Sequence, residues 1–156
     1  DWSFLEQPPA MTLLYGREIP PVGGDTLYAD QQAAYAAMPD DLKRRVDGRM
    51  GIHSARRGYS KAGQYGDRDV GRSMAIVADD SALATQLHPL VLTHPETGRK
   101  GLFLSPGYTI GIDGMDDAAA QALLLELYAY QCQEPFVYRH RWSTGMVTLW
   151  DNRAVN

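Results

Sequence analysis

The sequence has 156 residues, about the length of one domain, and 44% hydrophobic and 22% charged residues, which excludes a disordered chain. No apolar run approaches the roughly 18 residues of a membrane span. The net charge is −4, and the single cysteine, Cys132, cannot form an internal disulfide. We therefore expect a cytoplasmic protein without a membrane partner.

Positive charge is concentrated in residues 43–72, which hold nine of the fifteen Lys and Arg residues against three Asp. A cationic stretch in an acidic protein favours a small anion as partner, although a solvated surface explains it equally well. Nucleic acid is not expected, because the overall balance is acidic and few aromatic residues interleave with the basic ones.

Short strands and two helices are predicted for the first third of the chain. Thr, Tyr and Ile favour a strand over residues 10–19, and the two prolines and two glycines in residues 20–24 predict a turn. Asp30 is a suitable N-cap for a helix over 31–38. The other elements expected here are strands at 1–4, 26–29 and 50–54 and a helix at 40–47.

Residues 56–72 are rich in Gly, Tyr and Arg and show no periodicity. A stretch of this length without regular structure is more often a functional lid than a simple connector. We therefore predict a lid loop over residues 56–72.

The remaining residues predict a hairpin, a long helix and two further strands. Two apolar runs, 87–93 and 100–105, flank a Gly-bearing turn. Asp116 or Asp117 caps a helix over 117–131, and residues 136–142 alternate with a period of two before a strand at 146–150. The pattern predicts one domain that is mostly β with flanking helices, most simply around a double-stranded β-helix (jelly-roll) core.

The residues alone indicate no complete catalytic set. None of the four histidines stands at a metal-ligand spacing from another. His88 and His94, each followed by proline, are expected to make local backbone hydrogen bonds, and His140 is expected to be a core histidine. The role of His53, which lies beside the basic segment, is left open. No nucleophile elbow, phosphate loop or dinucleotide fingerprint occurs.

Five short motifs occur in a fixed order along nearly the whole chain. They are Asp-Trp-Ser-Phe at 1–4, Gly-Gly-Asp-Thr at 23–26, His-Pro-Leu-Val-Leu-Thr-His-Pro at 88–95, Leu-Phe at 102–103 and Trp-Asp-Asn-Arg at 150–153. Their order and spacing resemble the taurine dioxygenase family. This family comprises Fe(II)- and 2-oxoglutarate-dependent oxygenases, including sulfonate, alkyl-sulfate and aryloxyalkanoate hydroxylases. Each motif alone is weakly specific, whereas five in register are strongly specific.

The resemblance implies an iron site of two histidines and one carboxylate, with open positions for 2-oxoglutarate and O2. Asp1 matches the carboxylate ligand. The first histidine would lie two residues before Asp1, and the second directly after Asn156. The arginine that pairs with 2-oxoglutarate would follow further on. The resemblance thus implies a single oxygenase domain that is incomplete at both termini.

The resemblance also implies roles for residues within the chain. Thr26 matches a threonine that helps to hold the 2-oxoglutarate carboxylate, although a plain strand residue would look the same. Phe103 matches an aromatic residue of the substrate pocket, where core packing is the alternative. In the predicted lid, Tyr65 and Arg57 are candidates for contacting an anionic substrate. Residues 150–153 are expected to brace the strand end behind the metal.

The implied activity is hydroxylation of a small anionic substrate, a sulfonate, sulfate ester or carboxylate, with release of succinate and CO2. The alternative is a non-catalytic β-barrel protein or pseudo-enzyme that lacks the metal triad and keeps an anion pocket. A homo-oligomer is compatible with both.

Overall fold

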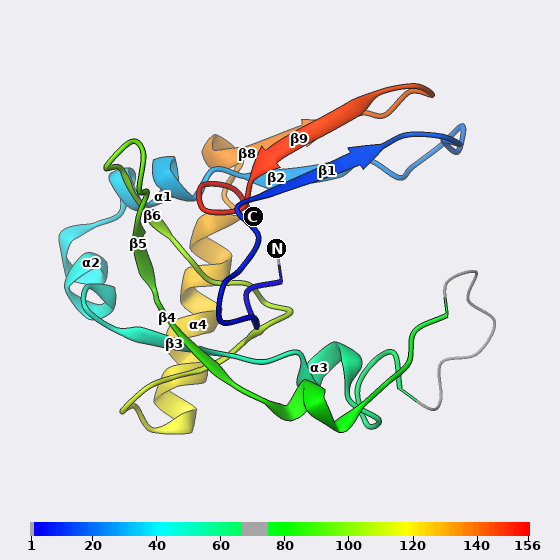
Figure 1. Ribbon diagram of the computed structural model, residues 1–156. Coiled ribbons are helices and arrows are strands. Elements are labelled where there is room, and N and C mark those ends of the chain that lie inside the picture. The colour runs from blue at the N-terminus through cyan, green and yellow to red at the C-terminus, as the bar shows by residue number, and fades with distance from the viewer. Residues whose placement is uncertain (1, 67–74) are drawn as a thin grey trace.

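The computed structural model describes residues 2–66 and 75–156 (Figure 1). Asp1 and lid residues 67–72 therefore lie outside the described residues. Helices and strands are mixed throughout the described part. The strands are β1 Met11–Tyr15, β2 Thr26–Ala29, β3 Met50–His53, β4 Gln86–Pro89, β5 Val91–Thr93, β6 Lys100–Leu102, β7 Thr109–Ile112, β8 Val137–His140 and β9 Val147–Asp151. The α-helices are α1 Gln31–Ala37, α2 Asp40–Val46, α3 Arg56–Tyr59 and α4 Asp117–Gln131, with 3-10 helices at Asp80–Leu83 and Glu134–Phe136.

The two ends of the sequence pair with each other. β1 lies antiparallel to β9, and β2 lies antiparallel to β8. Beyond the strands, Asp30 forms a bridge with Val155, and the Ala29 amide donates to the Asn156 carbonyl at 2.7 Å. Residues more than a hundred positions apart in the sequence thus form one side of the molecule.

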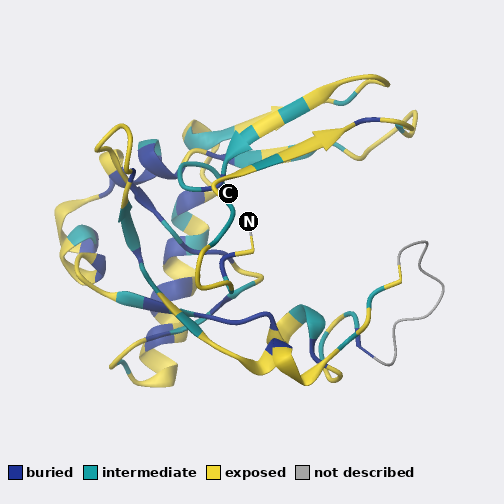
Figure 2. Ribbon diagram, viewed as in Figure 1, coloured by how far each residue is buried: buried dark blue, intermediate teal, exposed yellow. Residues whose placement is uncertain are grey.

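The middle of the chain supplies the core. β3 lies between β4 and β7 in a three-stranded antiparallel sheet, and β5 and β6 form a hairpin. α4 lies beside β7, and α1 lies beside β6. The face of α4 that is buried in Figure 2 carries Leu123, Leu124 and Leu127, all at most 3% exposed. No helix in the described ranges is both long enough and apolar enough to cross a membrane.

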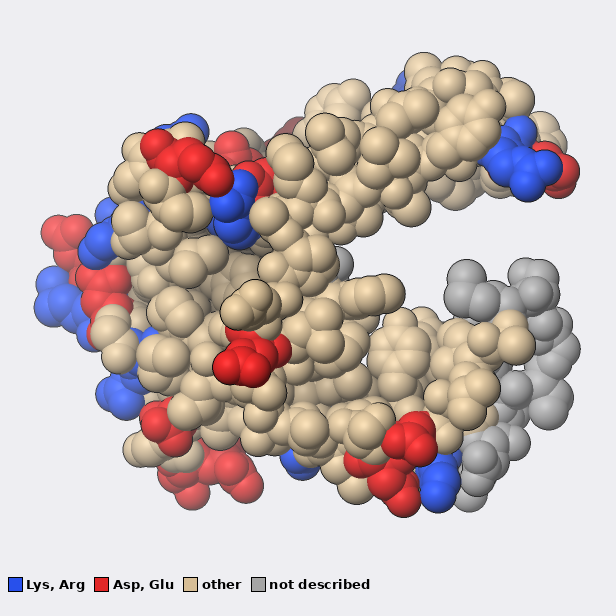
Figure 3. All heavy atoms as spheres, in the orientation of Figure 1, with Lys and Arg blue, Asp and Glu red and all other residues tan. Residues whose placement is uncertain are grey.

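β1 and β9 project from this core as an arm (Figure 1). Their antiparallel register places alternate residues of both strands on one face, and five large apolar side chains of this face are exposed. On its visible side the arm carries charged atoms mainly near its tip (Figure 3). The exposed apolar residues are Met11, Leu13, Tyr15, Val147 and Leu149.

Most predicted elements are confirmed, including the helix at 117–131 and the N-caps Asp30 and Asp116. The predicted fold class is confirmed in part, because helices and strands are mixed in the described residues. The hairpin joins β5 to β6, whereas β4 pairs with β3. The segment expected at 1–4 is not a strand in its described part, where residues 3 and 4 form a turn. The predicted lid begins with a short helix, α3, followed by turns.

The buried face of α4 gives a direct test of how this helix packs against the core. Leu124 is 0% exposed, whereas its neighbour Leu125 is 65% exposed. We expect Leu124→Ala to lower the free energy of unfolding by about 2–5 kcal/mol, because it leaves a cavity. Leu125→Ala is the matched control and should cost less than about 1 kcal/mol, because Leu and Ala have similar helix propensities. Equal losses in urea unfolding would contradict the placement of α4.

Candidate functional site

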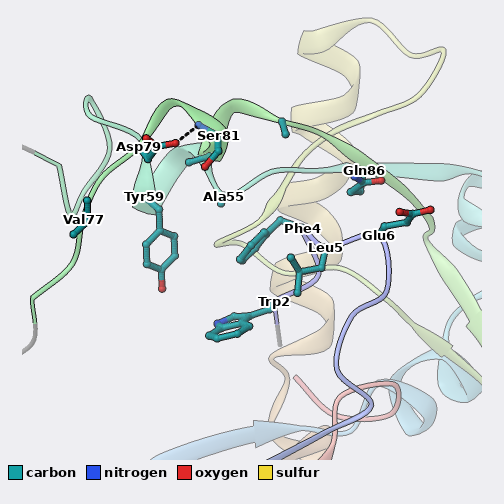
Figure 4. A pocket seen from close by; sticks show the side chains of 12 residues that line it. Trp2, Phe4, Leu5, Glu6, Ala55, Tyr59, Val77, Asp79, Ser81 and Gln86 are labelled. Carbon is teal, nitrogen blue, oxygen red and sulfur yellow. Dashed lines mark hydrogen bonds between the residues drawn. The ribbon is translucent and has the colours of Figure 1, made fainter.

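The segment that follows Asp1 forms one wall of a cavity of about 510 Å³ (Figure 4). Trp2, Phe4 and Leu5 line it from one side, and Tyr59 of α3 lines it from another. None of the described lining residues is Lys or Arg. The cavity is therefore suited to an apolar group, with polar atoms only at part of its boundary. The remaining lining residues are Glu6, Ala55, Val77, Asp79, Ser81, Ala82, Ala84 and Gln86.

Aromatic contacts fix this wall. The ring of Phe4 lies 5.0 Å from that of Tyr108 and 6.4 Å from that of Tyr59. Burial, followed by interaction with Tyr59, raises the pKa of Tyr108, so its phenol stays protonated. Asp79 accepts a hydrogen bond from the Ser81 amide at 2.7 Å, and this bond keeps the pKa of Asp79 below its usual value. Its carboxylate is thus an N-cap at the cavity edge.

The predicted lid residues lie at different distances from this cavity. Tyr65 packs against Tyr59, with ring centroids 5.4 Å apart, and so adjoins a lining residue. Arg57 donates to the Pro106 carbonyl at 2.7 Å and lines a separate cavity with Ile110. The guanidinium of Arg57 is therefore already bound to a backbone oxygen, and it is not part of the aromatic cavity.

Phe103 lies where the N-terminal and C-terminal segments meet. Its ring is 5.8 Å from that of His53 and 5.6 Å from that of His88. Together with Ser3 and Asn156, Phe103 lines a small cavity. The two segments that flank the predicted ligand positions thus converge on this aromatic side chain.

His53 and His88 gain contacts that no sequence spacing indicated. His53 Nδ1 lies 2.8 Å from Ser3 Oγ, and His88 Nε2 lies 2.9 Å from the Leu5 carbonyl oxygen. The bond expected for His88 is therefore to the backbone, but to a residue 83 positions away. Burial, and secondarily His88, lowers the pKa of His53 to about 4, so that it is neutral at pH 7. Only the pairing of β3 with β4 brings the two histidines together.

Thr26 lines a second cavity, of about 600 Å³, together with Leu14, Arg17 and Trp142. The Trp142 indole Nε1–H donates to Thr26 Oγ1 at 2.9 Å. The hydroxyl proton of Thr26 remains available, because no described residue accepts it. A carboxylate in this cavity could accept that proton, so Thr26 fits the role that the resemblance implies.

The Trp-Asp-Asn-Arg motif forms a network at the end of β9. Asp151 accepts from His94 Nε2 at 3.0 Å and from Arg153 Nη2 at 2.6 Å. Arg153 also contacts Glu96 at 3.0 Å, and Asn152 Nδ2 donates to the Pro9 carbonyl at 2.9 Å. The network ties β9 to the β5–β6 turn and to the N-terminal segment, as expected for a brace.

The arginine dominates the electrostatics of this network. Its hydrogen bonds hold the pKa of Asp151 well below the usual range of a carboxyl group. The pKa of Arg153 is correspondingly raised by Asp151 and Glu96. Asp151 is therefore ionised at all ordinary pH values, and its charge is paired.

His94, Glu96 and Asp151 each place one potential ligand atom within 4.8 Å of the others. A divalent cation is disfavoured there, because the Arg153 guanidinium already forms ion pairs with both carboxylates. Both nitrogens of His94 are also engaged: Nδ1 accepts from the amides of Glu96 and Thr97 at 3.3 Å, and Nε2 faces Asp151. The local backbone bonds predicted for His94 are confirmed, and the cluster is best explained as an ion-pair network.

The family model described as taurine catabolism dioxygenase TauD, TfdA family matches residues 1–156. The chain belongs to this family. The family that the five motifs indicated is thereby confirmed, and its members among the relatives below are named as α-ketoglutarate-dependent dioxygenases. α-Ketoglutarate is another name for 2-oxoglutarate.

Two relatives illustrate the likeness in sequence. The (S)-phenoxypropionate/alpha-ketoglutarate-dioxygenase of Sphingobium herbicidovorans is 39% identical over 137 residues, which cover 88% of this chain and 47% of the relative. The alpha-ketoglutarate-dependent 2,4-dichlorophenoxyacetate dioxygenase of Cupriavidus pinatubonensis is 36% identical over 155 residues, covering 99% of this chain and 51% of the relative. The chain spans about half the length of the curated relatives it matches.

Solved structures agree with this. The crystal structure of AAD-2 in complex with Mn(II) and N-oxalylglycine superimposes with a TM-score of 0.82 at 30% identity, covering 99% of this chain and 50% of that one. A taurine dioxygenase from Burkholderia xenovorans gives a TM-score of 0.78 at 32% identity, covering 99% of this chain and 48% of that one. The fold is therefore that of this family's members over the matched half.

The Asp151 network predicts a pH dependence of stability. A carboxyl group whose pKa is lower in the folded state stabilises that state above its unfolded pKa, and the contribution is lost as pH falls. We expect Asp151→Asn to destabilise the protein at neutral pH, with a difference from wild type that shrinks below about pH 4. Urea unfolding at neutral and acidic pH measures this. The exposed Asp113→Asn variant is the control, and a difference that stays constant with pH would contradict the prediction.

Proposed function

We propose that the protein is an Fe(II)- and 2-oxoglutarate-dependent dioxygenase. In the proposed reaction, substrate, O2 and 2-oxoglutarate give hydroxylated substrate, succinate and CO2. Family membership along the whole chain is the observation that carries the proposal. We propose a cytoplasmic location, consistent with the single cysteine, and a jelly-roll core to which the antiparallel pairs β1–β9 and β2–β8 contribute.

Asp1 is the proposed carboxylate ligand of the iron, with two histidines outside residues 1–156 as the others. The support is the convergence of the segments next to these positions. Ser3, two residues after Asp1, and Asn156 line the same small cavity beside Phe103. When bound, iron together with 2-oxoglutarate supplies the oxidising power for inserting an oxygen atom into a C–H bond.

Thr26 is proposed to donate its hydroxyl proton to a carboxylate of 2-oxoglutarate. The Trp142 indole N–H donates to the Thr26 hydroxyl oxygen, so the hydroxyl proton is available to the ligand. This arrangement orients the donor before the cosubstrate arrives, so less rotational freedom is lost on binding.

A small anionic substrate, a sulfonate, sulfate ester or carboxylate, is proposed on the basis of the relatives and the basic segment. Phe103 and Tyr65 would contribute aromatic surface. The apolar body of the substrate suits the cavity lined by Trp2, Phe4 and Tyr59. Arg57 could pair with the anionic group only after leaving the Pro106 carbonyl.

The competing proposal is a binding protein or pseudo-enzyme without an iron site. The specific observation behind it is that both carboxylates of the one cluster of three potential ligands in the described residues are ion-paired with Arg153. A pseudo-enzyme would bind 2-oxoglutarate or a substrate anion without forming succinate.

The decisive experiment measures succinate formed by the full-length protein with Fe(II), 2-oxoglutarate and a panel of sulfonates, alkyl sulfates and aryloxyalkanoates. We expect succinate that depends on iron, with substrate increasing its rate. Asp1→Asn is the matched inactive variant. Binding of 2-oxoglutarate without stoichiometric Fe(II) binding and without succinate formation would support the pseudo-enzyme instead.

A second prediction concerns Thr26→Val, which removes the hydroxyl and preserves the shape of the side chain. We expect KM for 2-oxoglutarate to rise roughly tenfold or more, because a hydrogen bond to a charged group contributes about 1.5–3 kcal/mol. Thr93→Val, at the exposed end of β5, is the matched control. An unchanged KM would show that Thr26 is only a strand residue.

A further inference from the structure

The N-terminal segment, residues 2–6, lies in the protein without belonging to a strand. Among the described residues, a local backbone bond joins the Leu5 amide to the Trp2 carbonyl at 3.2 Å. Trp2 has a φ of 43°, in the left-handed region that side chains other than glycine rarely adopt. Such a conformation persists only where surrounding contacts hold it. The segment must therefore be held by side chains from elsewhere in the protein.

Two histidines on neighbouring strands provide those contacts. His53 on β3 is 0% exposed and reaches the Ser3 hydroxyl, which is itself buried, at 2.8 Å. His88 on β4 donates from Nε2 to the Leu5 carbonyl at 2.9 Å. The two hydrogen bonds lie on either side of Phe4. His53 bonds to the Ser3 side chain, and His88 bonds to the Leu5 backbone.

The histidines are themselves held in place. Their rings meet edge to face, with centroids 5.2 Å apart, and both rings contact Phe103. Gly51, two residues before His53, makes room for this arrangement: a Cβ there would lie 3.0 Å from His53 Nε2. The strands thus present a rigid pair of imidazoles to the segment.

The hydrogen-bond pattern indicates the tautomer of His53. Its Nε2 is buried and has no partner in the described part of the chain. A buried N–H without an acceptor is rarer than an unpaired acceptor. We therefore assign the proton to Nδ1, which donates to Ser3 Oγ. The ring is fixed by this bond, by a longer contact of Nδ1 with Thr109 Oγ1 at 3.5 Å and by its aromatic neighbours.

We propose that His53 and His88 are positioning residues that hold residues 2–6 and thereby set the orientation of Trp2 and Phe4 in the aromatic cavity. Neither histidine lines that cavity, whereas Trp2, Phe4 and Leu5 all do. The two residues act on the substrate-binding wall through the segment they grip. The contacts of His53 and His88 with residues 2–6 form a histidine clamp. The importance of this wall for catalysis rests on the proposed function, but the clamp itself does not.

The test labels the full-length protein with fluorotryptophan and records fluorine NMR spectra without substrate. Residues 1–156 hold three tryptophans, whose resonances are identified with Trp→Phe variants. Trp2 lies in the segment, while Trp142 and Trp150 lie in the β8–β9 region and serve as internal references. We expect His88→Leu and His53→Leu each to shift or broaden the Trp2 resonance and to leave the other two unchanged.

Conservative variants separate positioning from simple packing. The side-chain amide of His88→Gln can still donate to the Leu5 carbonyl, and that of His53→Asn can still donate to Ser3 Oγ. Both should restore the wild-type Trp2 resonance. A Ser3→Ala background removes the bond to His53 while the His53 ring keeps its contacts with His88 and Phe103, so this background should also shift the Trp2 resonance. This background also serves if His53→Leu alone fails to fold.

An unmoved Trp2 resonance in the folded His88→Leu protein would overturn the clamp, as would equal shifts of all three tryptophans. The measurement is independent of turnover. A shifted Trp2 resonance in His88→Leu, together with no succinate formation by the wild-type protein, would keep the clamp and reject the dioxygenase. Succinate formation by the wild-type protein, together with an unmoved Trp2 resonance in His88→Leu, would keep the dioxygenase and reject the clamp.

Discussion

Antiparallel pairing between the two ends of the chain holds the rest of the structure in position. β1 pairs with β9 and β2 with β8, and the pairing continues past the strands to Asn156. The loss of conformational entropy in closing such distant segments is large and is offset only by contacts made after closure. The Asp151 network and the Asn152 bond to Pro9 are contacts of this kind.

This pairing explains how a site can be built from opposite ends of the sequence. The N-terminal segment and the residues after β9 meet at Phe103, between the histidines of β3 and β4 on one side and Asn156 on the other. The middle of the chain supplies support for this site, with α4 filling the core and α3 closing one side of the aromatic cavity. The exposed apolar face of the β1–β9 arm has no counterpart in the described residues, and the relatives are about twice as long.

Local signals were readable from the sequence, and long-range contacts were not. Asp30 and Asp116 marked helix starts because an N-cap acts within three residues. The bond of the Arg57 side chain to Pro106 and the pairing of β4 with β3 depend on residues tens of positions away. The same holds for His53 and Ser3, which are 50 positions apart and share no periodicity. The family motifs indicated Thr26 and Phe103, but the histidine clamp follows only from the register of β3 and β4.

The central claim is that iron is held where the chain ends converge and not in the carboxylate network of β9. Anaerobic titration of the full-length protein with Fe(II) tests it most directly, comparing wild type with Asp1→Asn and Glu96→Gln. We predict that Asp1→Asn abolishes stoichiometric binding and that Glu96→Gln leaves the dissociation constant unchanged. Loss of binding in Glu96→Gln, with Asp1→Asn unaffected, would contradict the account.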